Sequence, residues 1–145
     1  MGDIERVASS AIEAGLGIHR DVGPGLLESA YETILAEKLR RLGLQVDRQV
    51  PIDIEYDGIA VTGAYRIDLL VEHALIIEIK ATEQTLPVYS RQVLTYLKFS
   101  GLSLGFVMNF GMATFKDGLR RLVLDHPTSY SSSRLRANHS AGPAR

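Results

Sequence analysis

The spacing of hydrophobic residues changes twice along this chain. Between Gly25 and Gly43, apolar residues recur at every third or fourth position, which predicts an amphipathic helix bounded by two glycines. From 44 to 56 the apolar residues alternate with polar ones, which predicts a strand. Helical spacing also occurs over 3–17 and over 88–100, and it predicts a helix in each of these segments.

Four further apolar runs, each bounded by turn residues, predict strands. They span residues 59–72, 74–81, 102–111 and 119–124. Asp57-Gly58 is a hairpin turn signal and the next link is also short, so the first three strands are expected to be antiparallel. The helix over 88–100 provides a crossover to a parallel neighbour. We therefore expect an α/β fold, in the order helix, three strands, helix, strand, with a mixed central sheet flanked by helices.

The composition fits one domain and excludes several kinds of site. A chain of 145 residues can enclose a single core, which we expect within residues 1–125. Residues 126–145 are rich in Ser, Ala, Arg and Pro, and they predict a disordered tail. The absence of cysteine excludes disulfides, zinc–thiolate sites and iron–sulfur clusters. No apolar run approaches the ~20 residues of a membrane span, so we expect a cytoplasmic protein that does not enter a membrane.

The net charge of the predicted domain argues against binding to nucleic acid through long-range electrostatic attraction alone. All 17 acidic residues lie within residues 1–125, where they outnumber 13 basic residues and leave a net charge of −4. Proteins that hold nucleic acid through long-range electrostatics are usually basic. An enzyme of nucleic acids built on this chain would therefore need a local basic groove and a cation.

Glu78 and Lys80 interrupt an otherwise apolar strand in the segment ALIIEIKAT. Because side chains two positions apart point to the same face of a strand, these two charges are expected to lie together. A buried charge costs free energy unless it is paired or binds a metal. A structural ion pair is one explanation of this pattern, and a metal site is the other.

Asp68 raises the same question in the preceding strand, YRIDLLVEH. Asp68 and Leu70 are expected on one face of this strand. Ile67 and Leu69 are expected on the other, so both faces carry apolar residues. The tight turn that follows makes Asp68 a neighbour of Glu78, if the register permits. Two adjacent carboxylates resist ionising together, and a divalent cation with a preference for oxygen ligands, Mg²⁺ or Mn²⁺, resolves that conflict.

Glu28 lies on the apolar stripe of the helix between Gly25 and Gly43. On a helical wheel it falls between Tyr31 and Leu39, so we expect it to face the core. A solvated glutamate, favoured in the first turn by the helix dipole, is the alternative. The dipole explains an acid at this end of the helix but does not explain its place on the apolar face.

These residues resemble a known group of enzymes. Asp68, followed on the next strand by Glu78-Ile79-Lys80, resembles the PD-(D/E)XK nuclease superfamily. Within that superfamily, the segment HRDVGPGLLESAYE resembles the bacterial GxxExxY protein family, through Gly25, Glu28 and Tyr31. The resemblance extends from about His19 to Val123, and it implies a restriction-endonuclease-like core.

The resemblance also implies metal-dependent cleavage of phosphodiester bonds. Asp68 and Glu78 would bind the metal, and the backbone carbonyl of Ile79 would be a further ligand. Glu28 would hold a metal-bound water or a second metal. Lys80 would orient the attacking water and stabilise the developing charge. A cation fits this chemistry because it lowers the pKa of bound water and neutralises phosphoryl oxygens.

Four other residues have a functional and a structural explanation. Gln92 and Tyr96 lie one helical turn apart and resemble the glutamine–tyrosine motif of RecB-like members, which helps to place the substrate; a surface glutamine beside a core tyrosine is the alternative. His19 would be a metal ligand, as in some relatives, or a capping or loop-packing residue. Tyr31 would position the substrate or belong to the core.

The sequence thus favours a Mg²⁺- or Mn²⁺-dependent nuclease that acts on DNA rather than RNA. The alternative is a catalytically inactive module of the same fold that binds nucleic acid or a protein partner. A structural domain with a buried ion network is the third explanation. The sequence also allows a homodimer.

Overall fold

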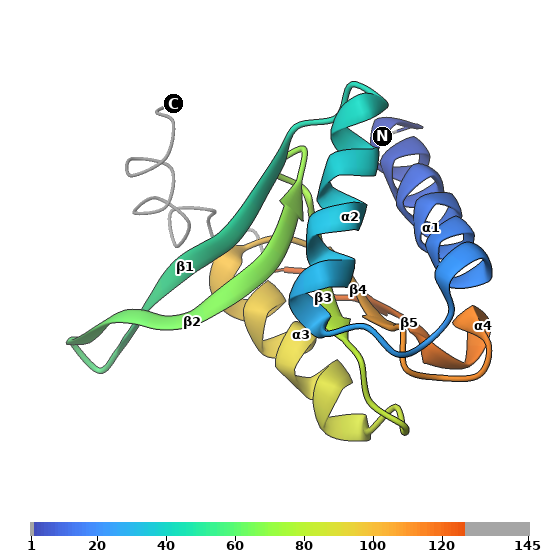
Figure 1. Cartoon of the computed structure of the whole chain (residues 1–145). Coiled ribbons are helices and arrows are strands. Elements are labelled where there is room, and N and C mark those ends of the chain that lie inside the picture. The colour runs from blue at the N-terminus through green and yellow to red at the C-terminus, as the bar shows by residue number, and fades with distance from the viewer. Residues whose placement is uncertain (1, 127–145) are drawn as a thin grey trace.

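The computed structural model describes residues 2–126, which form a five-stranded mixed sheet with helices on both faces (Figure 1). The elements in chain order are α1 (Gly2–Val22), α2 (Glu28–Arg41), β1 (Val46–Tyr56), β2 (Ile59–Val71), β3 (Leu75–Lys80), α3 (Pro87–Ser100), β4 (Leu104–Asn109), α4 (Phe115–Gly118) and β5 (Leu119–Val123). The strand order is β1-β2-β3-β4-β5; β3 and β4 are parallel, and the other pairs are antiparallel. The predicted α/β fold and its order of elements are confirmed, and the short α4 is an addition to them.

The sheet separates two hydrophobic clusters. On one face, α1 and α2 pack against strand residues such as Leu75 and Ile77. On the other face, α3 packs against a second set, which includes Ile76. Because side chains alternate along β3, Glu78 and Lys80 lie on the same face as Ile76 and point toward α3. The two charges therefore share the face of the sheet that α3 covers.

α1 is longer than the predicted helix over 3–17. Gly15 lies inside the helix without ending it, because close packing requires a glycine there: a Cβ atom on Gly15 would lie 2.7 Å from the ring of Phe115. Gly23, with a φ of 76°, follows the last turn of α1 and ends it. His19 consequently lies in the last turn of α1, before the glycine loop.

The paired strands β1 and β2 change faces part-way along their length. Leu69 and Val71 pack with α1 and α2, whereas Ile67 packs with α3. The prediction that Ile67 and Leu69 share a face is therefore wrong. The change occurs beside Gln49, whose φ of 52° departs from strand geometry. Beyond this point the two strands extend away from the sheet as a hairpin, seen at the left of Figure 1, that turns at Asp57.

Two further predictions concern membrane insertion and the C-terminal tail. No helix within residues 2–126 is long and apolar enough to cross a membrane. The predicted disordered tail over 126–145 lies, apart from His126, outside the described residues. His126 itself packs onto the domain, with Nε2 2.6 Å from the carbonyl oxygen of Leu102.

Candidate active site

The pairing between β2 and β3 ends where the acidic residues begin. The last paired residues are Leu69 and Ile77, so continuing this register would place Asp68 opposite Glu78. The ladder stops there, and Oδ2 of Asp68 accepts a hydrogen bond of 2.8 Å from the backbone N–H of Ile79. The carboxylate thus takes the place of a backbone acceptor from β2. This bond holds Asp68 against the segment that carries Glu78.

Glu78 is a buried acid that is only partly satisfied. Its side chain is 8% exposed, and its Oε2 lies 3.5 Å from Nζ of Lys80. Its Oε1 is buried and has no hydrogen-bond partner among residues 2–126. The Lys80 ammonium also lies 4.7 Å from the centre of the Tyr89 ring on α3. A structural ion pair between Glu78 and Lys80 therefore leaves one carboxylate oxygen unsatisfied, at a cost of about 1–3 kcal/mol.

Burial opposes the ionisation of both acids, and the charge of Asp68 further opposes that of Glu78. Burial, followed by the charge of Asp68, raises the pKa of Glu78 to about 8, against the lowering effect of Lys80. Burial also raises the pKa of Asp68, while the hydrogen bond from Ile79 lowers it. A divalent cation would relieve both effects, because it favours the charged form of each acid. Two carboxylates, one with an unused oxygen, fit the oxygen ligands that Mg²⁺ and Mn²⁺ prefer.

Glu28 does not face the core, and that prediction is wrong. It is the first residue of α2 and is exposed, whereas Tyr31 and Leu39 on the same stripe are fully buried. The core covers the middle turns of α2 but not its ends, which also leaves Leu42 exposed. The charge of Glu28 still contributes, as the last of several causes, to the raised pKa of Asp68 and of Glu78. Glu28 therefore lies at the open border of the acidic pair.

Tyr31 is buried and anchors the loop that precedes α2. Its hydroxyl donates a hydrogen bond to the carbonyl of Gly23 and accepts one of 3.2 Å from the N–H of Leu26. Gly25 in this loop has a φ of 127°, a conformation that favours glycine. The loop and the tyrosine together determine where α2 begins, and so where Glu28 lies. This arrangement gives a physical reason for the spacing of Gly25, Glu28 and Tyr31 in this chain.

His19 packs against the loop before α4. Its Nε2 lies 2.7 Å from the carbonyl oxygen of Met112, and its ring lies 6.4 Å from that of Phe115, centre to centre. A carbonyl can only accept, so Nε2 carries the hydrogen. These contacts are those of a loop-packing histidine. Over the whole described range, no three His, Asp or Glu side chains form a group that could hold a metal ion by themselves.

Gln92 and Tyr96 lie in α3 beside the acidic pair. Burial, then the charges of Glu78 and Asp68, raise the pKa of Tyr96 above its ordinary value, so its hydroxyl keeps its proton. The ring of Tyr96 stacks on Tyr65 at 4.4 Å. Both rings and Gln92 line an open pocket of about 370 Å³ between α3 and the hairpin. The glutamine and the tyrosine thus line the same pocket, and the tyrosine lies within electrostatic range of both acids.

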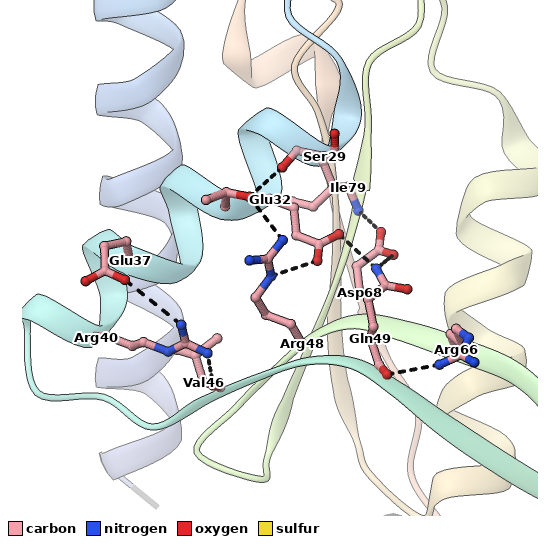
Figure 2. A network of polar contacts seen from close by, with 11 residues as sticks. Ser29, Glu32, Glu37, Arg40, Val46, Arg48, Gln49, Arg66, Asp68 and Ile79 are labelled. Atoms are coloured by element: carbon pink, nitrogen blue, oxygen red, sulfur yellow. Dashed lines mark hydrogen bonds and ion pairs between the residues drawn. The ribbon is translucent and has the colours of Figure 1, made fainter.

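Three residues that the sequence analysis did not single out connect α2 to Asp68. Glu32 is buried, and its Oε2 accepts a hydrogen bond of 3.0 Å from Nε of Arg48. Its Oε1 accepts one of 2.9 Å from Nε2 of Gln49, and the same amide nitrogen donates to Oδ1 of Asp68 at 3.2 Å (Figure 2). Glu32 follows Glu28 by one helical turn, which is a signal in the sequence. Gln49 has no such signal, because its role depends on a cross-strand contact.

Asn109 fixes the loop that follows Lys80. Its side-chain amide is fully buried at the end of β4 and makes five hydrogen bonds, to Thr82, Gln84, Thr85 and Gly111. Gly111 permits the close approach, since a Cβ atom there would lie 2.3 Å from the carbonyl oxygen of Thr82. This network determines how the chain leaves β3 and enters α3.

The sheet topology, with one acid on β2 beside an acid and a lysine at the end of β3, defines a protein with a restriction-endonuclease-like nuclease fold. A family model of the PD-(D/E)XK nuclease superfamily matches residues 5–122. The chain therefore belongs to the PD-(D/E)XK nuclease superfamily. No curated protein and no solved structure matches it. The narrower resemblance to the GxxExxY family stays a prediction.

Proposed function

We propose that this protein is a Mg²⁺- or Mn²⁺-dependent nuclease that hydrolyses phosphodiester bonds in DNA, with residues 1–125 as its catalytic domain. The observation that carries the proposal is the pair of adjacent acids, half-buried Asp68 and buried Glu78, with Lys80 on the same face as Glu78. Two acids and one lysine would stabilise the fold poorly, because one acid has no cationic partner away from solvent. In a member of a nuclease superfamily, this set would have a direct catalytic use.

Asp68 and Glu78 are the residues that would hold the cation, and the backbone carbonyl of Ile79 would be a further ligand. Glu28, at the open border of the pair, would act through a bridging water or on a second ion. His19 remains a candidate ligand only through Nδ1, since Nε2 donates to Met112. When bound, the cation would supply Lewis-acid activation of water and neutralise charge on the phosphate.

Lys80, Gln92 and Tyr96 would act on the substrate directly. The Lys80 ammonium, held by Glu78 and the Tyr89 ring, would orient the attacking water and stabilise charge that develops on the phosphate. Tyr96 keeps its proton, so its hydroxyl would donate a hydrogen bond to a phosphate oxygen. The Gln92 amide would position the nucleotide strand from the wall of the pocket.

Local positive charge near the pair supports nucleic-acid binding despite the acidic domain. Arg66 is exposed on β2, and its Nη1 lies 3.4 Å from the carbonyl oxygen of Gln49, the residue that contacts Asp68 (Figure 2). Arg48 is partly exposed while it pairs with Glu32. Arginine forms strong hydrogen bonds to phosphate. We assign to Arg66 a phosphate contact beside the site.

An inactive binding module is the second candidate, and two observations favour it. Glu28 is exposed, and it does not complete a group of three metal-binding side chains with Asp68 and Glu78. The domain also carries a net charge of −4. In this case the acids would hold an ion that shapes a surface for nucleic acid or for a protein partner. A homodimer is compatible with both candidates.

Cleavage assays with matched variants separate the two. We expect purified protein with Mn²⁺ or Mg²⁺ to cleave at least one form in a panel of single-stranded, duplex and branched DNA and RNA. Asp68→Asn should abolish cleavage, whereas Asp57→Asn, an exposed aspartate at the tip of the hairpin, should not change it. If Asp68→Asn cleaves as fast as the wild type, the activity comes from a contaminant and the assignment of Asp68 to the active site is wrong. Metal-dependent binding of nucleic acid without cleavage would support the module.

A further inference from the structure

The amide of Gln49 bridges two carboxylates from different elements. Its Nε2 donates to Oε1 of Glu32 at 2.9 Å and to Oδ1 of Asp68 at 3.2 Å, which uses both of its hydrogens (Figure 2). Glu32 is 6% exposed and lies on α2, whereas Asp68 lies on β2. Two acids that would otherwise repel each other are therefore joined by one donor group.

Asp68 is fixed at both of its oxygens. Oδ1 accepts from Gln49, and Oδ2 accepts from the backbone N–H of Ile79 at 2.8 Å. Two donors from opposite sides determine the plane of the carboxylate. A carboxylate has about four acceptor positions, so each oxygen of Asp68 keeps one for another partner. The carboxylate is held in one orientation without being saturated.

Glu32 is itself held in place. Its Oε2 accepts from Nε of Arg48 at 3.0 Å, and Nη2 of that arginine donates to the hydroxyl of Thr33 at 3.0 Å. The contacts run from α2 through Glu32 and Gln49 to Asp68. Because α2 packs into the main core, Asp68 is oriented by a rigid element beyond its own strand.

The backbone of Gln49 is unusual for a glutamine. Its φ of 52° lies in the left-handed region, in the middle of β1 and between Arg48 and Val50, which pair with the residues on either side of Asp68. A residue other than glycine is strained there, and such strain persists where the surrounding structure imposes it. The side-chain bonds of Gln49 depend on this conformation, which directs the amide between the two acids.

We propose that Gln49, held by Glu32, is a positioning residue that orients Asp68 for cation binding. This inference rests on the proposed function, since it takes Asp68 as a ligand of the cation. Gln49 touches neither the cation nor the substrate and acts through Asp68. Partners that orient metal ligands commonly change metal affinity by 10–100-fold when they are removed.

The test uses Gln49→Gly, which removes the amide and suits the left-handed backbone. Asp57→Gly is the matched control, because Asp57 has a φ of 53° and lies at the exposed hairpin turn. We expect Gln49→Gly to weaken Mn²⁺ binding, measured by calorimetry, by about 10–100-fold, and Asp57→Gly to bind like the wild type. Higher Mn²⁺ concentrations should restore cleavage by Gln49→Gly.

A second measurement does not depend on metal binding. In the metal-free protein, the amide of Ile79 should exchange its hydrogen faster in Gln49→Gly than in Asp57→Gly, because Asp68 is then held less firmly. Wild-type Mn²⁺ affinity together with unchanged Ile79 exchange in Gln49→Gly would overturn the positioning role. A wild-type protein that binds no Mn²⁺ would instead overturn the proposed function, while Ile79 exchange would still decide whether Gln49 holds Asp68. Gln49→Asn, whose amide is one carbon too short to bridge, provides the same test if the glycine variant does not fold.

Discussion

Glu78 and Asn109 are buried polar residues at the ends of two neighbouring parallel strands, and they are satisfied to very different degrees. Asn109, at the end of β4, uses its amide in five hydrogen bonds to the surrounding loops. Glu78, near the end of β3, contacts Lys80 through one oxygen, and its other oxygen finds no donor anywhere in the described part of the chain. The charge of Asp68 beside it is one cause of the raised pKa of Glu78.

The difference separates a structural polar group from a candidate functional one. A satisfied buried amide stabilises the fold, because removing it would leave several partners without hydrogen bonds. An unsatisfied buried acid beside another acid costs free energy in the folded state. Such a cost is commonly found where a site is arranged for a ligand. The comparison therefore assigns Asn109 to the scaffold and supports our proposal for Glu78.

The largest expected effect is on cleavage. Lys80→Ala should lower kcat on DNA by about 10²-fold or more, because it removes the positive charge beside the reacting phosphate. Its unfolding free energy should change by less than that of an Asn109 variant. Lys98→Ala, on the exposed part of α3, is the matched control. Steady-state kinetics with Mn²⁺ check the first expectation; a Lys80→Ala enzyme with normal kcat would remove the lysine from the mechanism.

The next effect is on stability and concerns Asn109. Asn109→Ala should lower the free energy of unfolding by about 2–4 kcal/mol, because several hydrogen bonds are lost and their partners stay buried. Gln84→Ala, which changes an exposed side chain in the same loop, should have little effect. Urea denaturation measures both variants. A small loss in Asn109→Ala would mean that its network does not stabilise the scaffold.

The third effect is a pH dependence that arises from Glu78. Its pKa is about 8 in the folded protein and 4.5 ordinarily, so between these values the folded state binds more protons than the unfolded state. The unfolding free energy of the metal-free protein should therefore fall as pH rises from 4.5 to 8, because the raised pKa of the folded state reverses the usual trend for an acid. Asp68, whose pKa is also raised, acts in the same direction.

Glu78→Gln tests this pH dependence, because it cannot ionise. We expect the decline in stability between pH 4.5 and 8 to be much smaller in Glu78→Gln than in the wild type, as measured by urea denaturation at several pH values. Glu83→Gln, which changes an exposed acid nearby, should keep the wild-type slope. Equal slopes in wild type and Glu78→Gln would show that Glu78 is not an acid of raised pKa.

The smallest expected effect concerns the loop before α2. Tyr31→Phe removes the hydroxyl that contacts Gly23 and Leu26 and should lower the free energy of unfolding by about 1 kcal/mol. Tyr56→Phe, at a tyrosine that is 76% exposed, should have no measurable effect. Thermal denaturation of both variants checks this. An unchanged Tyr31→Phe protein would mean that the hydroxyl does not anchor the loop.

The hydrophobic pattern predicted the fold well because each period corresponds to a physical element. Alternation along β3 placed Glu78 and Lys80 on one face, and the short turn before it made Asp68 a neighbour. A helical wheel could not show how far the core extends along α2, so it misplaced Glu28. Gln49 had no sequence signal, because its contacts depend on a positive φ and on the register between two strands.

The central claim is that Asp68 and Glu78 form a binding site for a divalent cation. The most direct measurement is the melting temperature of the wild type and of Asp68→Asn, without nucleic acid, as Mn²⁺ is added. We expect the melting temperature of the wild type to rise with Mn²⁺ concentration, since a ligand that binds the folded state stabilises it. The melting temperature of Asp68→Asn should not rise. No rise in the wild type, or the same rise in both proteins, would contradict the claim.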